Sequence, residues 1–243
     1  MSILVIGESC LDIFTYGECK RLCPEAPVPV FNSTYKVENG GMAYNVYRNL
    51  LALNVECCLN TNTNYRQITK TRFVDEKTNH MFMRLDENDK SFENCKVKKI
   101  NFSSYDAVIV SDYNKGYLTK DDIEYIGKEH PLVFLDTKKI LGSWCKNINF
   151  IKINLDEFER TKHILNEEIS DKLIITMGGS GARHKEIIYP VPEVEIKDTS
   201  GAGDTFVAAL VTEFIKNRNI GKSIKFGNEC ATKVVQKKGV SVI

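Results

Sequence analysis

The chain has 243 residues, 42% of them hydrophobic, a length that allows one domain with a substantial core and leaves little room for two. Its 33 basic residues against 32 acidic residues exclude the strong positive charge that is typical of nucleic-acid-binding proteins. No apolar run approaches the roughly 20 residues of a membrane-spanning helix, so we expect one domain over residues 1–243 whose partners include neither nucleic acid nor a membrane.

The eight cysteines do not follow a metal-binding or disulfide pattern. Cys19 and Cys23 are four residues apart, and no C-x-x-C pair occurs. The start of the chain, Met1–Glu8, is apolar but short, lacks a basic residue and turns acidic, which indicates a buried strand rather than a signal peptide. We therefore expect reduced thiols and a cytoplasmic protein.

Short apolar runs alternate with helical patterns, which is typical of a parallel sheet covered by helices on both faces. The predicted strands are Ile3–Ile6, Ala107–Val110, Leu132–Leu135, Phe150–Ile153 and Leu173–Thr176. Helical patterns cover Lys120–Gly127, Asp156–Leu165 and Phe206–Phe214. Ligands of such sheets bind at the carboxyl ends of the strands. Five residues follow these ends closely: Asp12, Asp112, Asp136, Asn154 and Gly178.

Two segments, residues 13–37 and 69–86, break this alternation and have extended, partly alternating character. Pro24, Pro27 and Pro29 confine part of the first segment to a sheet edge or a loop. We expect the two segments to form a small β lid over the active end of the sheet.

The most informative run is Lys197–Phe206, in which Gly201–Gly203 and then Asp204 lead into an apolar helix. A glycine-rich turn before a helix leaves backbone N–H groups free to bind an anion. A carboxylate repels a resting phosphate, so Asp204 fits better as the acceptor of a proton from a hydroxyl that attacks a phosphoryl group. The structural alternative is a helix cap made by Asp198 or Thr199, with Asp204 placed to suit the helix dipole.

The whole string D-T-S-G-A-G-D-T-F resembles the C-terminal signature of the ribokinase-like sugar kinases, the PfkB family. The resemblance implies an α/β fold, a ribokinase-like three-layer sandwich with a central, mainly parallel sheet and a small β lid. It also implies an ATP-dependent sugar kinase that uses Mg²⁺. In that family the first acid starts the loop, here Asp198, and the anion hole falls on the amides of Gly201, Ala202 and Gly203. The catalytic base falls on Asp204.

Two further features resemble the N-terminal, sugar-binding part of this family. Asp12 corresponds to an acid that binds the phosphate acceptor, although an acid at a strand end is by itself more often a turn or cap residue. The string from Gly40 and Gly41 to Asn45 is similar to the signature Gly-Gly-x-x-x-Asn, whose positions contact the sugar. Without the resemblance these residues predict only a loop and the first turn of a helix.

Asn154 and Glu157 match the family's Asn-x-x-Glu element, which implies contact of Asn154 with the nucleotide phosphates and of Glu157 with magnesium through its waters. A capping box predicts the same pair, so the local sequence does not separate the two readings. The glycine-rich turn after Leu173–Thr176 alone predicts only a β-turn, and no P-loop motif is present. The resemblance assigns the nucleotide to further residues, which are Thr176, Gly178, Gly181, Asp198 and Asn228. Asn228, together with Ala231 and Gly239, resembles positions that wall the adenine pocket.

Other strings resemble one branch of the family, the kinase domain that phosphorylates D-glycero-D-manno-heptose 7-phosphate at O1. These strings are Arg21–Val30, Lys70–Phe73, Arg84–Asp86 and Ser111–Thr119. A phosphorylated sugar needs cations around its phosphate. The candidates, each of which is otherwise a solvated surface charge, are Arg21, Lys70, Arg72, Arg84 and Lys115.

The chain also departs from the family. Cys57–Thr69 is only about a dozen residues long where the family carries a further strand–helix pair, and Asp136-Thr137-Lys138 replaces Asp-Pro-Lys. We expect no cytidylyltransferase domain, which in this branch is sometimes fused to the kinase. We expect O1 of D-glycero-D-manno-heptose 7-phosphate as the acceptor, with fructose, a fructose phosphate, ribose and a nucleoside as alternatives.

Alternatives outside the sugar kinases are an inactive relative that binds nucleotide or sugar as a sensor, and a nucleoside-phosphate hydrolase. By analogy with the family we expect a possible homodimer through the lid.

Overall fold

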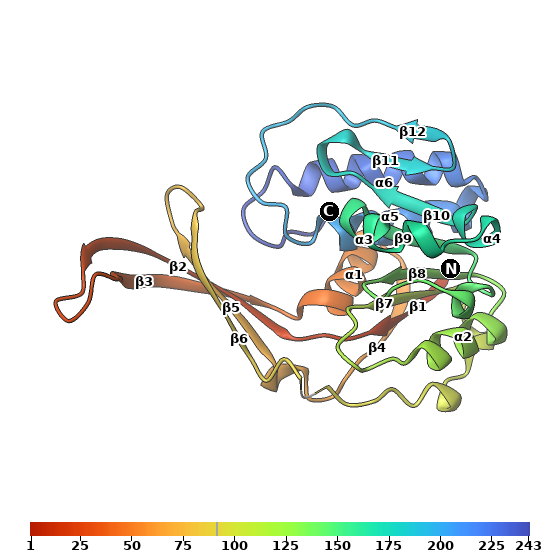
Figure 1. Ribbon diagram of the computed structural model, residues 1–243, viewed down its shortest axis with the longest axis horizontal. Helices are drawn as coiled ribbons and strands as arrows, with labels where there is room; N and C mark the ends of the chain where they lie inside the picture. Colours follow the sequence, from red (N-terminus) through yellow and green to blue (C-terminus); the bar gives the residue numbers. More distant parts are fainter. Residues whose placement is uncertain (91) are drawn as a thin grey trace.

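The larger of two sheets forms the body of the molecule (Figure 1). The structure is a computed structural model that describes residues 1–90 and 92–243, and within these residues this sheet has eight strands in the order β12-β11-β10-β9-β8-β7-β1-β4. All pairs between β4 and β10 are parallel, and β11 and β12 add an antiparallel edge. The predicted, mainly parallel sheet is confirmed. The strands are β1 (Ser2–Gly7), β4 (Glu56–Asn60), β7 (Ala107–Asp112), β8 (Val133–Thr137), β9 (Phe150–Asn154), β10 (Leu173–Thr176), β11 (Ala182–His184) and β12 (Ile187–Tyr189).

Helices cover both faces of this sheet because its central strands are apolar on both sides. Along β1, Ile3 and Val5 pack with α1, α5 and α6, whereas Leu4 and Ile6 pack on the face covered by α2, α3 and α4. Successive side chains of a strand point to opposite faces, so a strand between two helical layers is a continuous apolar run. The helices are α1 (Gly41–Ala52), α2 (Lys120–Glu129), α3 (Leu155–Thr161), α4 (Glu167–Ser170), α5 (Ala202–Asn217) and α6 (Ile220–Val234).

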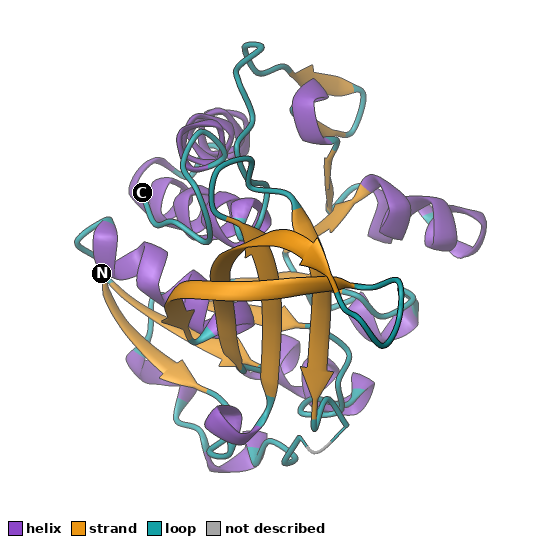
Figure 2. Cartoon of the chain, turned by 90° about the vertical axis from the view of Figure 1, so that its left-hand side faces the viewer, coloured by secondary structure: helices purple, strands orange, loops and turns teal. Residues whose placement is uncertain are grey.

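The second sheet is the lid, which extends away from the body in Figure 1 and lies in front of it in Figure 2. In the described chain it has four strands in the order β3-β2-β5-β6. The strands are β2 (Leu11–Leu22), β3 (Pro29–Asn39), β5 (Thr69–Asp75) and β6 (Met81–Glu87). The two segments that were predicted to form a β lid therefore pair in one sheet, with β2 parallel to β5. Pro24 and Pro27 lie in the turn of the β2–β3 hairpin, and Pro29 begins the edge strand β3.

The body and the lid are joined by short connections. Only Glu8, Ser9 and Cys10 separate β1 from β2, so Asp12 lies inside the first lid strand and not in a loop. The shortened segment after α1 forms β4, an edge strand of the large sheet, and a 3₁₀ turn at Tyr65–Gln67 before it enters β5. The lid is therefore fixed directly above the carboxyl ends of the parallel strands.

All eight cysteines are free thiols in the described structure. None of the helices described is long and apolar enough to cross a membrane.

Candidate active site

Two cavities of the described structure meet at the carboxyl ends of the parallel strands. The first, here the lid cavity, has a volume of about 330 Å³ and is lined by body residues together with the lid residues Asp12, Lys70, Arg72 and Arg84. The second, here the strand-end cavity, has a volume of about 740 Å³ and extends over β8, β9 and β10 to α5 and α6. Both cavities are lined by the same four residues where they meet: Tyr113, Lys138, Gly201 and Asp204.

The glycine turn lies at this junction and begins α5. Gly201 has a φ of +80°, and a Cβ there would lie 2.5 Å from Asn45 Nδ2, so conformation and space both require glycine. A Cβ on Gly203 would lie 3.0 Å from Lys152 Nζ. Gly201, Ala202 and Gly203 thus line the strand-end cavity next to a lysine, at a helix N-terminus that suits an anion. Of the three amides expected in the anion hole, that of Ala202 donates to Thr199 O at 3.2 Å.

The helix-cap alternative for this run does not hold, because α5 has no side-chain cap hydrogen bond in the described structure. The Asp198 carboxylate instead accepts hydrogen bonds from Ser200 N at 2.8 Å and Gly239 N at 3.2 Å. Asp198 therefore holds the shape of the loop and lines neither of the two cavities described here. Gly239, expected at the adenine pocket, also lies outside both linings, beside the Tyr16 hydroxyl.

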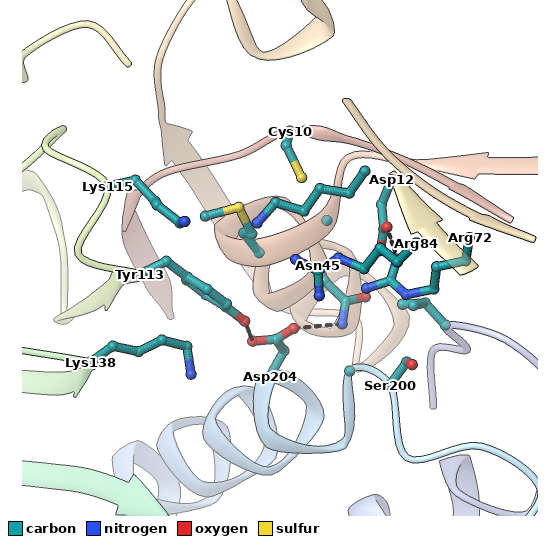
Figure 3. A pocket seen from close by; sticks show the side chains of 15 residues that line it. Cys10, Asp12, Asn45, Arg72, Arg84, Tyr113, Lys115, Lys138, Ser200 and Asp204 are labelled. Carbon is teal, nitrogen blue, oxygen red and sulfur yellow. Dashed lines mark hydrogen bonds and ion pairs between the residues drawn. The ribbon is translucent and has the colours of Figure 1, made fainter. Parts of the chain in front are cut away.

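Asp204 is the carboxylate at the centre of the site (Figure 3). It is only 5% exposed, and it accepts one hydrogen bond on each oxygen: from Tyr113 Oη to Oδ1 and from Asn45 Nδ2 to Oδ2, both at 2.9 Å. Burial raises its pKa to about 6, Asp136 adds to the rise, and the two hydrogen bonds and Lys152 oppose it. A carboxylate with a pKa near neutral pH is suited to accept a proton from a hydroxyl.

The lid cavity is bordered by cations. Arg72 on β5 forms an ion pair with the buried Asp12 on β2, and Lys70 and Lys115 both pair with Asp89. Burial raises the pKa of Asp12, and Arg72 opposes that rise.

Three other residues expected on the sugar side, Gly41, Asn45 and Arg84, also line the lid cavity. Gly40 does not line it: a Cβ on Gly40 would lie 2.2 Å from Tyr44 Cγ, and its carbonyl accepts from Cys10 N at 3.1 Å. Arg21 is exposed near the far end of β2 and lines neither cavity.

The strand-end cavity collects most of the residues expected to bind the nucleotide. Its lining includes Asn154, Thr176, Gly178, Gly181, Asn228 and Ala231. Asn228 is fixed by a hydrogen bond from Nδ2 to Tyr189 O at 2.8 Å. Val191, Pro192, Val194 and Ile196 add an apolar wall that suits a base.

The capping-box reading of Asn154 and Glu157 is confirmed. Asn154 Oδ1 accepts from Glu157 N at 2.8 Å, and Glu157 Oε2 accepts from Asn154 N at 2.7 Å. The other oxygen, Glu157 Oε1, accepts from Lys138 Nζ at 3.0 Å. The described residues contain no cluster of three or more metal-ligating side chains. The single carboxylate of Glu157 fits a magnesium ion that is held by phosphate oxygens and keeps its own waters, with Glu157 outside those waters.

The family follows from a comparison of the sequence with family models. The model of the pfkB family of carbohydrate kinases matches residues 49–242. The chain belongs to this family. It is therefore an ATP-dependent sugar kinase.

The curated relatives include two bifunctional HldE proteins. The bifunctional protein HldE of Helicobacter pylori strain J99 is 29% identical over 98% of this chain, and that of a Nitratiruptor species is 28% identical over 98%. The chain spans 63% and 62% of the length of these relatives.

Two solved structures share the fold. Ribokinase from Thermotoga maritima has a TM-score of 0.68 at 17% identity, with 98% of this chain and 94% of that chain covered. Phosphofructokinase-2 from Escherichia coli, in complex with substrates and products, has a TM-score of 0.70 at 16% identity, with 97% of this chain and 93% of that chain covered. The predicted ribokinase-like fold is thereby confirmed.

The pfkB signatures in the sequence did not predict that Tyr113, Lys138 and Lys152 belong to the site. Lys152 Nζ lies 3.0 Å from Asp136 Oδ2, and their side chains are only 11% and 12% exposed. One signal was available: Lys152 is a charge between Ile151 and Ile153 inside a strand that is otherwise apolar on both faces. For Tyr113 the sequence offered only its place in a string that resembles one branch of the family.

Proposed function

We propose that this kinase transfers the γ-phosphoryl group of ATP to O1 of D-glycero-D-manno-heptose 7-phosphate. The observation that carries the proposal is the cluster of cations at the lid cavity, whose described lining holds five cationic side chains. They pair with four carboxylates, those of Asp12, Asp86, Asp89 and Glu157, and two of the cations share Asp89. The cations are Lys70, Arg72, Arg84, Lys115 and Lys138. An unphosphorylated sugar would need no such set, whereas a phosphate is bound well by several cations. The strings that resemble the heptose kinase branch and the similarity to HldE proteins support the same acceptor.

In this proposal the sugar phosphate occupies the lid cavity and ATP occupies the strand-end cavity. The acceptor hydroxyl points to Asp204, which lines both cavities and is ionised at neutral pH because its pKa is about 6. Asp204 removes the hydroxyl proton as the oxygen attacks the γ-phosphorus in line, and the leaving oxygen remains on ADP. The amides at the start of α5 stabilise the charge on the transferred group.

The remaining residues hold the reactants. Asp12, Gly41 and Asn45 contact the sugar, while Asn154, Thr176, Gly178, Gly181 and Asn228 follow the nucleotide. Magnesium near Glu157, when bound, neutralises phosphate charge. Lys152 lies beside Gly203 and Asp136, where it can balance the negative charge of the phosphates.

We further propose that the chain is one kinase domain and forms a homodimer through its lid. Every residue of β6 is exposed, and the lid carries exposed apolar side chains on β2, β3 and β6. These include Leu22, Tyr35, Val37, Met81, Phe82, Met83 and Leu85. Such a surface is unusual for a monomer. Sedimentation should show a dimer that Phe82→Glu with Met83→Glu converts to a monomer; a monomeric parent chain would contradict the proposal.

The experiment that tests the proposed reaction is an ADP-release assay over a panel of acceptors. The panel contains heptose 7-phosphate, fructose 6-phosphate, fructose, ribose and adenosine, each with Mg²⁺ and ATP, and Asp204→Asn as the matched inactive control. We expect the highest kcat/KM with heptose 7-phosphate. Preference for another sugar would reject heptose 7-phosphate as the acceptor. ATP binding without turnover of any sugar would indicate an inactive relative. Phosphate release without a sugar would indicate a hydrolase.

A further inference from the structure

Tyr113 lies at the junction of the two cavities and contacts the carboxylate between them. Its hydroxyl donates to Asp204 Oδ1 at 2.9 Å (Figure 3). Tyr113 also lines both cavities. Lys138 Nζ lies 5.0 Å from the centre of the same ring. The tyrosine is therefore held against the candidate base at the place where acceptor and nucleotide have to meet.

The buried carboxylate of Glu8 holds the turn that carries Tyr113. Glu8, which is fully buried directly after β1, accepts hydrogen bonds from Tyr113 N at 2.8 Å and from Lys115 N at 3.0 Å. Asn114, between them, has a φ of +56° and donates from its N–H to Asp112 Oδ1 at 3.2 Å. Three consecutive backbone N–H groups thus donate to two buried carboxylates, which leaves the turn little conformational freedom.

We propose that Tyr113 is a positioning residue for the phosphoryl transfer: its hydroxyl orients the Asp204 carboxylate and favours its ionised form. The inference rests on the proposed role of Asp204 as the base. Tyr113 and Asn45 each donate to a different oxygen of Asp204, and a carboxylate can accept both bonds while it keeps lone pairs for the substrate proton. A protonated carboxyl would accept less well, so two donors stabilise the anion against the effect of burial.

Other charges face Asp204 and set the background for this effect. From β8, Asp136 disfavours the ionised form, and from β9, Lys152 favours it. The lid cavity that Asp204 lines adds one acid and several cations, which are Asp12, Lys70, Arg72, Arg84, Lys115 and Lys138. Removal of the Tyr113 hydroxyl leaves all of these groups in place, so its effect can be measured separately.

The test is Tyr113→Phe, measured as kcat/KM from pH 5 to 9 with whichever sugar the parent enzyme turns over. Loss of one hydrogen bond to a carboxylate should move the acidic limb of the profile upward by about one pH unit. With a parent pKa of about 6, the variant should then be about five-fold less active than the parent at pH 6 and nearly equal to it at pH 9. A merely structural role of the ring would lower the rate equally at every pH.

A second readout does not depend on the sugar acceptor. In protein labelled with ¹³C at the aspartate carboxyl carbon, the Asp204 signal is assigned by its loss in Asp204→Asn. Its titration midpoint should rise by about one pH unit in Tyr113→Phe. The matched control is Tyr117→Phe, because Tyr117 is also buried and its hydroxyl bonds to Asn60 outside both cavities.

The outcomes separate this inference from the proposed function. A shift in the titration and in the acidic limb supports the role of Tyr113, even if the preferred sugar is not a heptose phosphate. An unchanged midpoint together with parallel pH profiles overturns it. If Tyr113→Phe fails to fold, Tyr113→Leu also lacks the hydroxyl and has to show the same direction of shift.

Discussion

Replacement of Asp204 by Asn should remove activity and, at neutral pH, make the protein more stable. The folded state raises the pKa of this carboxyl from 3.8 to about 6, so ionisation of Asp204 opposes folding. Below about pH 3 the group is neutral in both states, and between about pH 3 and 6 the unfolded chain ionises first, so the folded state loses stability as the pH rises. At pH 7 the cost is about 3 kcal/mol, and at pH 5 about half of that. Loss of a general base should lower kcat by about 10²–10⁴.

The assay is urea unfolding of both proteins at pH 7 and pH 5, beside kcat at pH 7. We expect Asp204→Asn to exceed the parent in free energy of unfolding by about 3 kcal/mol at pH 7 and by about half as much at pH 5. Asp121→Asn is the matched control, because Asp121 also lies in the first turn of a helix but is exposed on α2. A variant less stable than the parent at pH 7, or one with near-full activity, would refute the reasoning.

Three further predictions follow from single contacts of the site. Lys115→Gln should raise KM for a phosphorylated sugar about 10–100-fold and leave KM for ATP unchanged; steady-state kinetics with each substrate varied decides. Gly201→Ala should lower the unfolding temperature and kcat, because its φ of +80° strains any Cβ by about 1–2 kcal/mol, whereas Gly179→Ala, in open space, should keep the parent's stability in thermal melts. Glu157→Gln should raise the Mg²⁺ concentration for half-maximal rate about ten-fold; an unchanged Mg²⁺ dependence would contradict it.

Much of the body could be predicted from the sequence because its pattern is local. Strands buried between two helical layers are short apolar runs, and all five predicted strands appear at nearly the expected residues. The glycine turn of α5 could be predicted for the same reason, since the left-handed φ of Gly201 is a property of that loop. The edge strands β4, β11 and β12 gave weaker signals because they are short or only partly buried.

The contacts that complete the site depend on pairings across the sheets and could not be predicted in this way. Tyr113 reaches Asp204 only because β7 is followed by a turn that Glu8 fixes, and Glu8 lies 105 residues earlier in the chain. Asp198 was expected at the nucleotide, but its carboxylate holds the backbone of its own loop. A motif identifies which residues lie near a site, whereas the direction of each side chain depends on the packing of the whole fold.

The most direct test of the account is identification of the product by ³¹P NMR. The kinase is incubated with Mg²⁺, ATP and heptose 7-phosphate, with Asp204→Asn as the parallel control. We predict one new phosphomonoester signal that couples to the anomeric proton, with one ADP formed for each product molecule and no such signal with the variant. A new phosphate at another position, free inorganic phosphate as the sole product, or equal product from Asp204→Asn would contradict it.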